Sequence, residues 1–451
     1  MSAINMTQGN VSRHLVGYTI PLVLGNLFQL MYNVVDSMIA GRFIGKEALA
    51  AAGTANPLMS IVILSISGVC VGSGVLMSEF FGAGNREKLK GEMATSVLFG
   101  LYFSLAVSVL GFIATKSLLR MIRVPAELLP MASAYLSIIF LGTPFTYFYN
   151  ALASALKSIG DSRTPLRFLM ISSVLNAVLD IIFIGFLGFG IVCSATTTVV
   201  AEGVSAALAA WHVYRNVPTL HLERREWRIH SDLLKKTLSF GSVTALQQSV
   251  QPIAKVLIQG AVNPLGIDVI AAFNAAERVD EFALLPERSM GQSLTTFTAQ
   301  NRGAGRMDRV KEGFQQGMLL ELAYGTVICV MILFLKEPLI RLFVTETGNE
   351  GLIEQGVRYL SMMSFFYILP ALTNGVQGFF RGMGDARMNL VCTLIQTTLR
   401  VACTYLLTPV IGIRGIAIAC AVGWTAMILY EIPCSIRLIR RMRTQVLSDE
   451  K

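Results

Sequence analysis

Several carboxyl and amide side chains recur at helical spacing inside long apolar stretches of this chain. Gln29, Asn33 and Asp36 follow one another at i, i+4 and i+7, and Asn176 and Asp180 at i and i+4. Each spacing places its residues on one face of a helix. A charged side chain at the centre of a lipid bilayer costs about 2.5–3.5 kcal/mol on insertion scales, so such residues need partners or a water-filled cavity.

The two aspartates are suited to binding a proton or a small cation. Two carboxylates that share a dry site cannot both ionise cheaply, so one of Asp36 and Asp180 would hold a proton. The same oxygens would also suit Na⁺, and the residues alone leave both ions open. For Asn33 and the hydroxyl cluster Thr196–Thr198, interhelical hydrogen bonding, worth about 0.6 kcal/mol on average, is an equally good explanation.

A second group of charged residues lies in the apolar stretch 268–299, where residues 277–288 contain four acids and two bases. One interpretation is internal pairing, for example of Lys255 with Glu277. The alternative is that spare acids attract a cationic substrate. The candidates for contact with a substrate are Gln29, Asn33, Glu277, Asp280, Glu281 and Arg288.

The elements that carry these residues are long apolar segments. Hydrophobic residues make up 53% of the 451 residues and charged residues only 14%, against about 25% charged in ordinary soluble domains. A bilayer-spanning helix needs about 20 apolar residues, and backbone groups in hydrocarbon must be satisfied within the segment, so the segments are predicted to be helices. The predicted spans are 15–40, 48–80, 93–115, 131–156, 168–186, 191–212, 237–262, 268–299, 314–335, 357–380, 388–409 and 413–436.

The chain repeats itself about half-way along. Gly82-Ala83-Gly84 matches Gly303-Ala304-Gly305 at an offset of 221 residues, and Tyr135-Leu136-Ser137 matches Tyr359-Leu360-Ser361 at an offset of 224. An internal duplication within membrane spans is typical of transporters. The predicted organisation is an N-lobe over 1–212, a linker over 213–236 and a C-lobe over 237–451.

Charge placement predicts the orientation in the membrane. With the N-terminus inside, the inner segments hold 24 of the 37 basic residues and the outer loops hold nine. This bias places both termini in the cytoplasm. The net charge of +9 therefore indicates contact with anionic membrane lipid and not binding to nucleic acid.

Motifs for catalysis are absent from the sequence. It contains no phosphate-binding loop for ATP hydrolysis and no His-Glu-x-x-His motif, and its Gly-rich patches do not complete a dinucleotide fingerprint. The seven cysteines lie in or beside the predicted spans, which argues against a disulfide framework. We expect no enzymatic activity and no cofactor, so that an ion gradient of H⁺ or Na⁺ would supply the energy.

The whole chain resembles the multidrug and toxic compound extrusion (MATE) transporters. The resemblance rests on the first span from Pro21 to Asp36, on Ser78–Gly84, Gly160–Pro165 and Asn176-x-x-x-Asp180, and on their partial repeats Gln300–Gly305 and Arg381–Asp385. It implies twelve helices in two six-helix lobes with a central cleft. It also implies export, by a monomer in the cell membrane, of cationic amphiphilic compounds in exchange for H⁺ or Na⁺. The family's N-lobe cation site carries over to Asp36, Asn176, Asp180 and Thr198.

The chain departs from one branch of the family, which has acids in the seventh and tenth helices. Here the seventh span carries Gln247, Gln248 and Gln251, and the tenth has no acid, so a C-lobe sodium site of that kind is in doubt. A lipid-linked oligosaccharide flippase of the same superfamily is the first alternative function. Its cleft is usually cationic, so Asp36, Asp180 and Glu281 argue against it, whereas Arg278, Arg288 and Arg400 keep it open. A passive channel or membrane scaffold is the second alternative.

The orientation can be tested by labelling a cysteine introduced at Ser231. With the native cysteines removed, Ser231→Cys should resist a membrane-impermeant thiol reagent in intact cells and react once the cells are opened. Ready labelling from outside would contradict the cytoplasmic placement of the linker.

Overall fold

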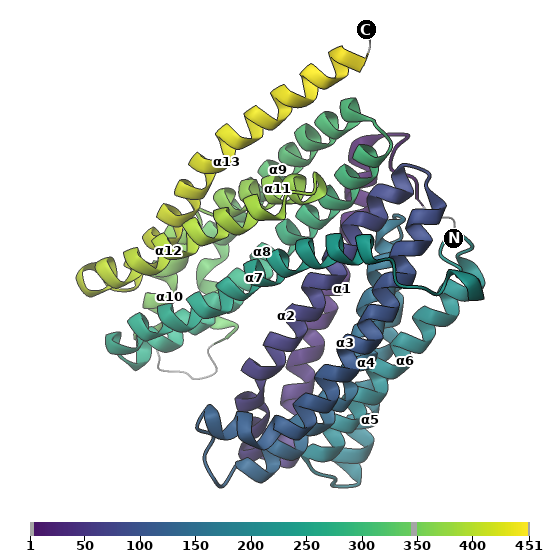
Figure 1. The fold of residues 1–451 in the computed structure, drawn as a ribbon. Helices are drawn as coiled ribbons and strands as arrows, with labels where there is room; N and C mark the ends of the chain where they lie inside the picture. The colour runs from purple at the N-terminus through teal and green to yellow at the C-terminus, as the bar shows by residue number, and fades with distance from the viewer. Residues whose placement is uncertain (1–3, 344–349, 450–451) are drawn as a thin grey trace. The chain divides into compact units, whose positions relative to one another are not determined.

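The computed structural model describes residues 4–343 and 350–449 (Figure 1). Within helices, the side chains of Asn33, Ser37, Ala40, Lys46, Leu49 and residues 443–449 lie outside this description. The described chain folds into α-helices joined by short turns. These are α1 Val11–Ile39, α2 Lys46–Gly82, α3 Arg86–Met121, α4 Leu129–Ser158, α5 Arg163–Asp180, α6 Ile191–Asn216, α7 Ser231–Val262, α8 Ile267–Gly303, α9 Met307–Arg341, α10 Glu350–Met363, α11 Ile368–Gly382, α12 Ala386–Ile411 and α13 Ile413–Asp449.

The chain is an all-α, multi-pass membrane protein. Nine of the helical segments in the described residues are long and apolar enough to cross a bilayer: α1 to α6, α9, α12 and α13, with α1 and α5 counted together with the segments that extend them. α7 carries the glutamines and α8 the charged cluster, and neither is among the nine. α10 and α11 are too short to cross a bilayer alone, with 14 and 15 residues. Helices cover the twelve predicted spans except for a turn within the tenth.

The tenth predicted span, 357–380, is not one helix. It divides into α10 and α11, and Ser364–Tyr367 form the turn between them. Pro370 stands in the first turn of α11, where its missing N–H costs nothing; further into a continuous helix the same residue would remove a hydrogen bond. The corresponding first-repeat helix, α4, runs unbroken past Pro144.

The helices form two compact units whose limits differ from the predicted lobes. Unit 1 is Ile20–Ala245 with residues 4–5, and unit 2 is Met6–Thr19 with the chain from Leu246 onward. The first turns of α1 therefore pack in unit 2, and the first turns of α7 pack in unit 1. The connection between α6 and α7 spans only residues 217–230, where Glu226 accepts two hydrogen bonds from Lys90 of α3 (3.0 and 3.1 Å).

Glycines let the start of α7 approach α2 closely in unit 1. A Cβ atom on Gly68 would lie 2.5 Å from the Gly241 carbonyl oxygen, and one on Gly72 would lie 2.9 Å from the Thr237 carbonyl oxygen. Small residues four apart permit this close packing of membrane helices. Thr237 also donates a 2.5 Å hydrogen bond to the buried Glu92 of α3.

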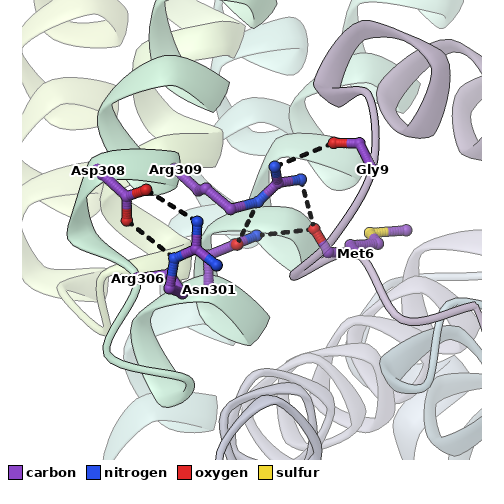
Figure 2. A network of polar contacts seen from close by, with 6 residues as sticks. All are labelled: Met6, Gly9, Asn301, Arg306, Asp308 and Arg309. Atoms are coloured by element: carbon purple, nitrogen blue, oxygen red, sulfur yellow. Dashed lines mark hydrogen bonds and ion pairs between the residues drawn. The ribbon is translucent and has the colours of Figure 1, made fainter.

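The N-terminal segment is anchored in unit 2 by Arg309 (Figure 2). The Arg309 guanidinium donates to the carbonyl oxygens of Met6 (3.1 Å) and Gly9 (3.0 Å) and to Asn301 Oδ1 (3.2 Å). Asn301 in turn donates to the Met6 carbonyl oxygen (3.3 Å). Arg309 is only 8% exposed, so these hydrogen bonds are shielded from water.

The two repeats keep the register that the sequence offsets predict. In unit 1, Ser154 Oγ of α4 donates to the Cys70 carbonyl oxygen of α2 (2.6 Å). At the matching positions in unit 2, a Cβ on Gly378 of α11 would lie 2.3 Å from the Gly291 carbonyl oxygen of α8. These two positions are related to the first pair by the offsets 224 and 221, so equivalent helices touch at equivalent residues.

Replacing Arg309 should loosen the N-terminal segment and lower stability. Hydrogen bonds from a charged donor contribute about 1.5–3 kcal/mol each, so we expect Arg309→Gln to cost at least about 2 kcal/mol. The melting temperature in detergent should fall, and amide hydrogen exchange around Met6 and Gly9 should accelerate. Arg306→Gln is the matched control, since Arg306 pairs with Asp308 at the exposed surface (3.0 Å) and such pairs add little. Equal behaviour of the two variants would contradict the anchoring role.

Candidate functional site

The predicted ion site lies in unit 1, where α1, α5 and α6 approach one another. Asp36 stands in the last turn of α1, and Asp180 is the last residue of α5. Both helices continue as short π-helices, Ala40–Ile44 and Ile181–Phe186. Such segments are rare and often occur at functional sites.

Asp180 is fully buried and accepts hydrogen bonds from α6 and from its own helix, α5. The Thr197 hydroxyl of α6 donates to its Oδ1. The Asn176 amide takes the orientation in which both its oxygen and its nitrogen are hydrogen-bonded. Its nitrogen then donates to Asp180 Oδ2 (3.0 Å) and to the Tyr32 hydroxyl of α1 (3.1 Å). In the same orientation the Asn176 oxygen accepts from the Thr198 backbone N–H (3.0 Å).

Asp36 completes the site from α1. Its carboxyl group lies within hydrogen-bonding reach of the Asp180 carboxyl group. Its Oδ1 atom is buried and has no hydrogen-bond partner among the described residues. No Lys or Arg in the described part of the chain forms an ion pair with either aspartate. Two carboxyl groups in this arrangement satisfy each other when a proton lies between them.

A small cavity lies on the other side of Thr198. It has a volume of about 50 Å³, room for a few water molecules. Thr198, Thr146, Thr143 and Glu202 supply its polar lining, and apolar side chains of α2 and α4 supply the rest. Thr146 donates a short hydrogen bond to Glu202, which is a third acid on the helices around the site.

The structure brings together the four residues predicted for the ion site, Asp36, Asn176, Asp180 and Thr198. Of the other polar residues on the first span, Gln29 is exposed, and the side chain of Asn33 lies outside the described residues.

Sequence analysis missed Tyr32 and Glu202, which also belong to this region, and it noted Thr197 only as part of a hydroxyl cluster. Tyr32 precedes Asp36 by four residues, and Glu202 follows Thr198 by four. The helical spacing that identified the aspartates could therefore have found both of these residues as well.

The charged cluster of α8 forms ion pairs within unit 2. Lys255 of α7 lies 3.0 Å from Glu281 and 3.9 Å from Glu277, and Arg278 lies 3.7 Å from Glu281. The predicted pairing of Lys255 with Glu277 is present, but Glu281 is the closer partner. The geometry therefore favours internal pairing over a free acid at Glu281.

The two remaining candidates of α8 have separate surroundings. Asp280 accepts hydrogen bonds from the hydroxyl groups of Tyr359 (3.0 Å) and Tyr367. Tyr367 lies in the turn between α10 and α11, so the break in the tenth span supplies a hydrogen-bond donor to Asp280. Arg288 is exposed.

Repeated membrane-spanning helices, with carboxyl groups buried between them, are typical of membrane transporters. The chain belongs to the MatE family, whose sequence model matches residues 21–182 and, separately, residues 244–406. The two matches coincide with the two copies of the internal repeat.

Individual relatives extend over nearly the whole chain. The chain is 30% identical over 421 residues to the probable multidrug resistance protein YpnP of Bacillus subtilis (strain 168), covering 93% of each chain. It is 24% identical over 421 residues to the FAD transporter of Shewanella oneidensis, covering 91% of each. A crystal structure of MATE in complex with MaL6 superposes with a TM-score of 0.92 at 22% identity, covering 98% of this chain and 100% of that one. This last likeness concerns the fold alone.

The pairing of Glu281 predicts how its neutralisation acts on transport. Because Lys255 and Arg278 already balance its charge, Glu281→Gln should change export of a cationic dye and of a neutral dye to the same extent. Protein content of the membrane should be measured in parallel. A selective loss of the cationic dye, by about tenfold or 1.4 kcal/mol, would instead show that Glu281 attracts substrate directly.

Proposed function

We propose that this protein is an antiporter that exports cationic amphiphilic drugs or toxins by alternating access, driven by protons bound in unit 1. The observation that carries the proposal is the contact between the Asp36 and Asp180 carboxyl groups, which come from different helices. The family membership and the multidrug-resistance name of the relative YpnP support the substrate class. Sodium is the alternative ion, with Asn176 and Thr198 as further oxygen donors.

Binding of the ion offers a direct link to movement of α1. Pro21 lies inside α1 and removes a backbone hydrogen bond, so the helix bends easily there. Thr19 and Ile20, next to this proline, are the residues at which α1 passes from unit 2 to unit 1. Protonation of Asp36 changes the charge at the far end of the same helix. We infer that the change is transmitted along α1 to the proline.

The proposal includes the setting of the protein. It operates as a monomer in the cell membrane, with both termini in the cytoplasm, and uses no bound cofactor. The lipid-linked oligosaccharide flippase is less well supported, because the polar site in unit 1 is acidic, whereas a pyrophosphate would need cations. The FAD transporter among the relatives makes an anionic substrate a second outcome that the experiment must detect.

Neutralising Asp36 should separate transport from binding. Asp36→Asn keeps the size and hydrogen bonding of the side chain but removes the titrating group. In proteoliposomes, efflux of a cationic dye driven by a pH gradient should fall to background, whereas equilibrium binding of the same dye should change less than about threefold. Asp180→Asn should behave alike. The double variant should be little worse than either single variant, because residues that act as one unit are not additive.

The control is Asp308→Asn, which removes an exposed carboxylate and should leave efflux unchanged. Replacing the pH gradient by a Na⁺ gradient identifies the ion, and adding an anionic dye identifies the substrate charge. Full gradient-driven efflux by Asp36→Asn at normal expression would refute the assignment of the coupling site.

A further inference from the structure

Two more buried carboxyl groups lie near each other in unit 2, on helices that carry no part of the unit 1 site. Glu287 of α8 and Glu321 of α9 are 0% and 1% exposed. Glu321 lies close enough to Glu287 to interact with its charge. Among the described residues, the carboxyl oxygens of Glu321 have no hydrogen-bond donor, and the side chain that offers one to Glu287 is that of Asn374. Buried polar groups are nearly always hydrogen-bonded, so this pair lacks a component that it needs.

The space around the pair is shaped by α11. The Glu321 side chain packs where Gly375 has no side chain: a Cβ there would lie 3.3 Å from Glu321 Cγ and 2.7 Å from Met318 Sδ. The Asn374 side chain lies beside Glu287, although its own amide nitrogen donates to the Pro370 carbonyl oxygen (2.9 Å). The carboxyl groups are therefore held between three helices.

The matching place in unit 1 contains no acid. By the repeat offsets, Glu287 corresponds to Ile66, Glu321 to Gly100 and Ala371 to Tyr147. A Cβ on Gly100 would lie 1.6 Å from the Tyr147 ring, which packs in a cluster with Ile66. A tyrosine thus fills in one repeat the space that two carboxyl groups occupy in the other. Ordinary apolar packing was available at this position, so packing alone does not account for the acids.

Few charged or titratable groups face the pair. Arg288, next to Glu287 on α8, brings a positive charge nearby, but its side chain is exposed and forms no described ion pair. Tyr324 and Cys329 of α9 and Tyr367 before α11 lie within electrostatic range. Of these, Tyr324 donates to the Ala283 carbonyl oxygen (2.8 Å) and Tyr367 donates to Asp280, so neither hydroxyl supplies the missing donor.

We propose that Glu287 and Glu321 form a second proton-binding site, in which the two carboxyl groups share one exchangeable proton. A proton held by the two carboxyl groups removes one of their two negative charges from the apolar interior and leaves a single negative charge near Arg288. The site takes up a further proton in acid and releases the shared one in alkali. Proton binding by Glu287 and Glu321 does not depend on the proposed function. Only a role of this proton in drug export rests on it.

Infrared spectroscopy of the purified protein in lipid nanodiscs tests the site directly, through the C=O stretch of protonated carboxyl groups. The wild type should show a deuterium-exchangeable band whose intensity changes with pH. Glu287→Gln/Glu321→Gln should abolish this contribution. Each single variant should move its pH midpoint by about one unit or more, because the two groups titrate as a pair.

Two controls keep the result interpretable. Glu277→Gln, on the same helix, and Asp36→Asn, in unit 1, should both retain the band. If dye efflux does not depend on the pH gradient, the proposed function fails. The infrared result for Glu287 and Glu321 is independent of that outcome. If the double glutamine variant does not fold, Glu287→Ile/Glu321→Gly/Ala371→Tyr reproduces the packing of the first repeat and should fold without the band.

Three results would overturn the proposal. The first is a double variant with the spectrum of the wild type. The second is a band that stays constant from acidic to alkaline buffer, which would indicate a permanently protonated pair. The third is a Na⁺-dependent, pH-independent response abolished by the same variants, which would indicate a sodium site.

Discussion

A carboxyl group surrounded by apolar helices must find a partner, and this requirement governs the interior of the protein. Transfer of an ionised carboxylate into a medium of low dielectric constant is so unfavourable that the group must be paired, hydrogen-bonded or neutralised. Each of these solutions occurs here. Asp280 is held by two tyrosine hydroxyls, and Glu281 is held by Lys255 and Arg278. The pairs Asp36–Asp180 and Glu287–Glu321 have no cation bonded to them among the described residues, and a proton is the simplest ligand that satisfies them.

Departures from regular α-helix lie beside these acids. The π-helices begin within four residues of Asp36 and directly after Asp180. The break between α10 and α11 places Tyr367 against Asp280. A continuous helix places its side chains at a fixed angular spacing. An interruption changes this spacing, so that a side chain can point toward an acid that it would otherwise miss. The break between α10 and α11 has no counterpart in the first repeat, where α4 is continuous, so the two repeats surround their acids differently.

Sequence alone predicted the helical class, the positions of most helices and the four residues that lie together in unit 1, because periodicity and hydropathy act locally. Asp36, Asn176 and Asp180 are conspicuous as polar residues in apolar runs, and Thr198 came from the family resemblance. The break at Ser364–Tyr367 was missed because the apolar run is continuous there and a proline is tolerated within a membrane span. The pairing of Lys255 depended on side-chain directions across two helices. Glu321 was overlooked because its partner is 34 positions away in the chain, and nothing local connects them.

The division of α1 and α7 between the two units has a consequence for dividing the chain into two halves. The first turns of α1 belong to unit 2, and the first turns of α7 belong to unit 1. Two subunits that swap their N-terminal segments show the same pattern. The first half expressed alone would expose Gly68 and Gly72 of α2, which otherwise pack against α7, to lipid or water. The second half alone would expose Arg309, which otherwise binds the Met6 carbonyl oxygen. Each half of the chain therefore depends on helical turns that belong to the other half. Split at residues 217–230, the halves should be stable as co-expressed partners and unstable as separate proteins.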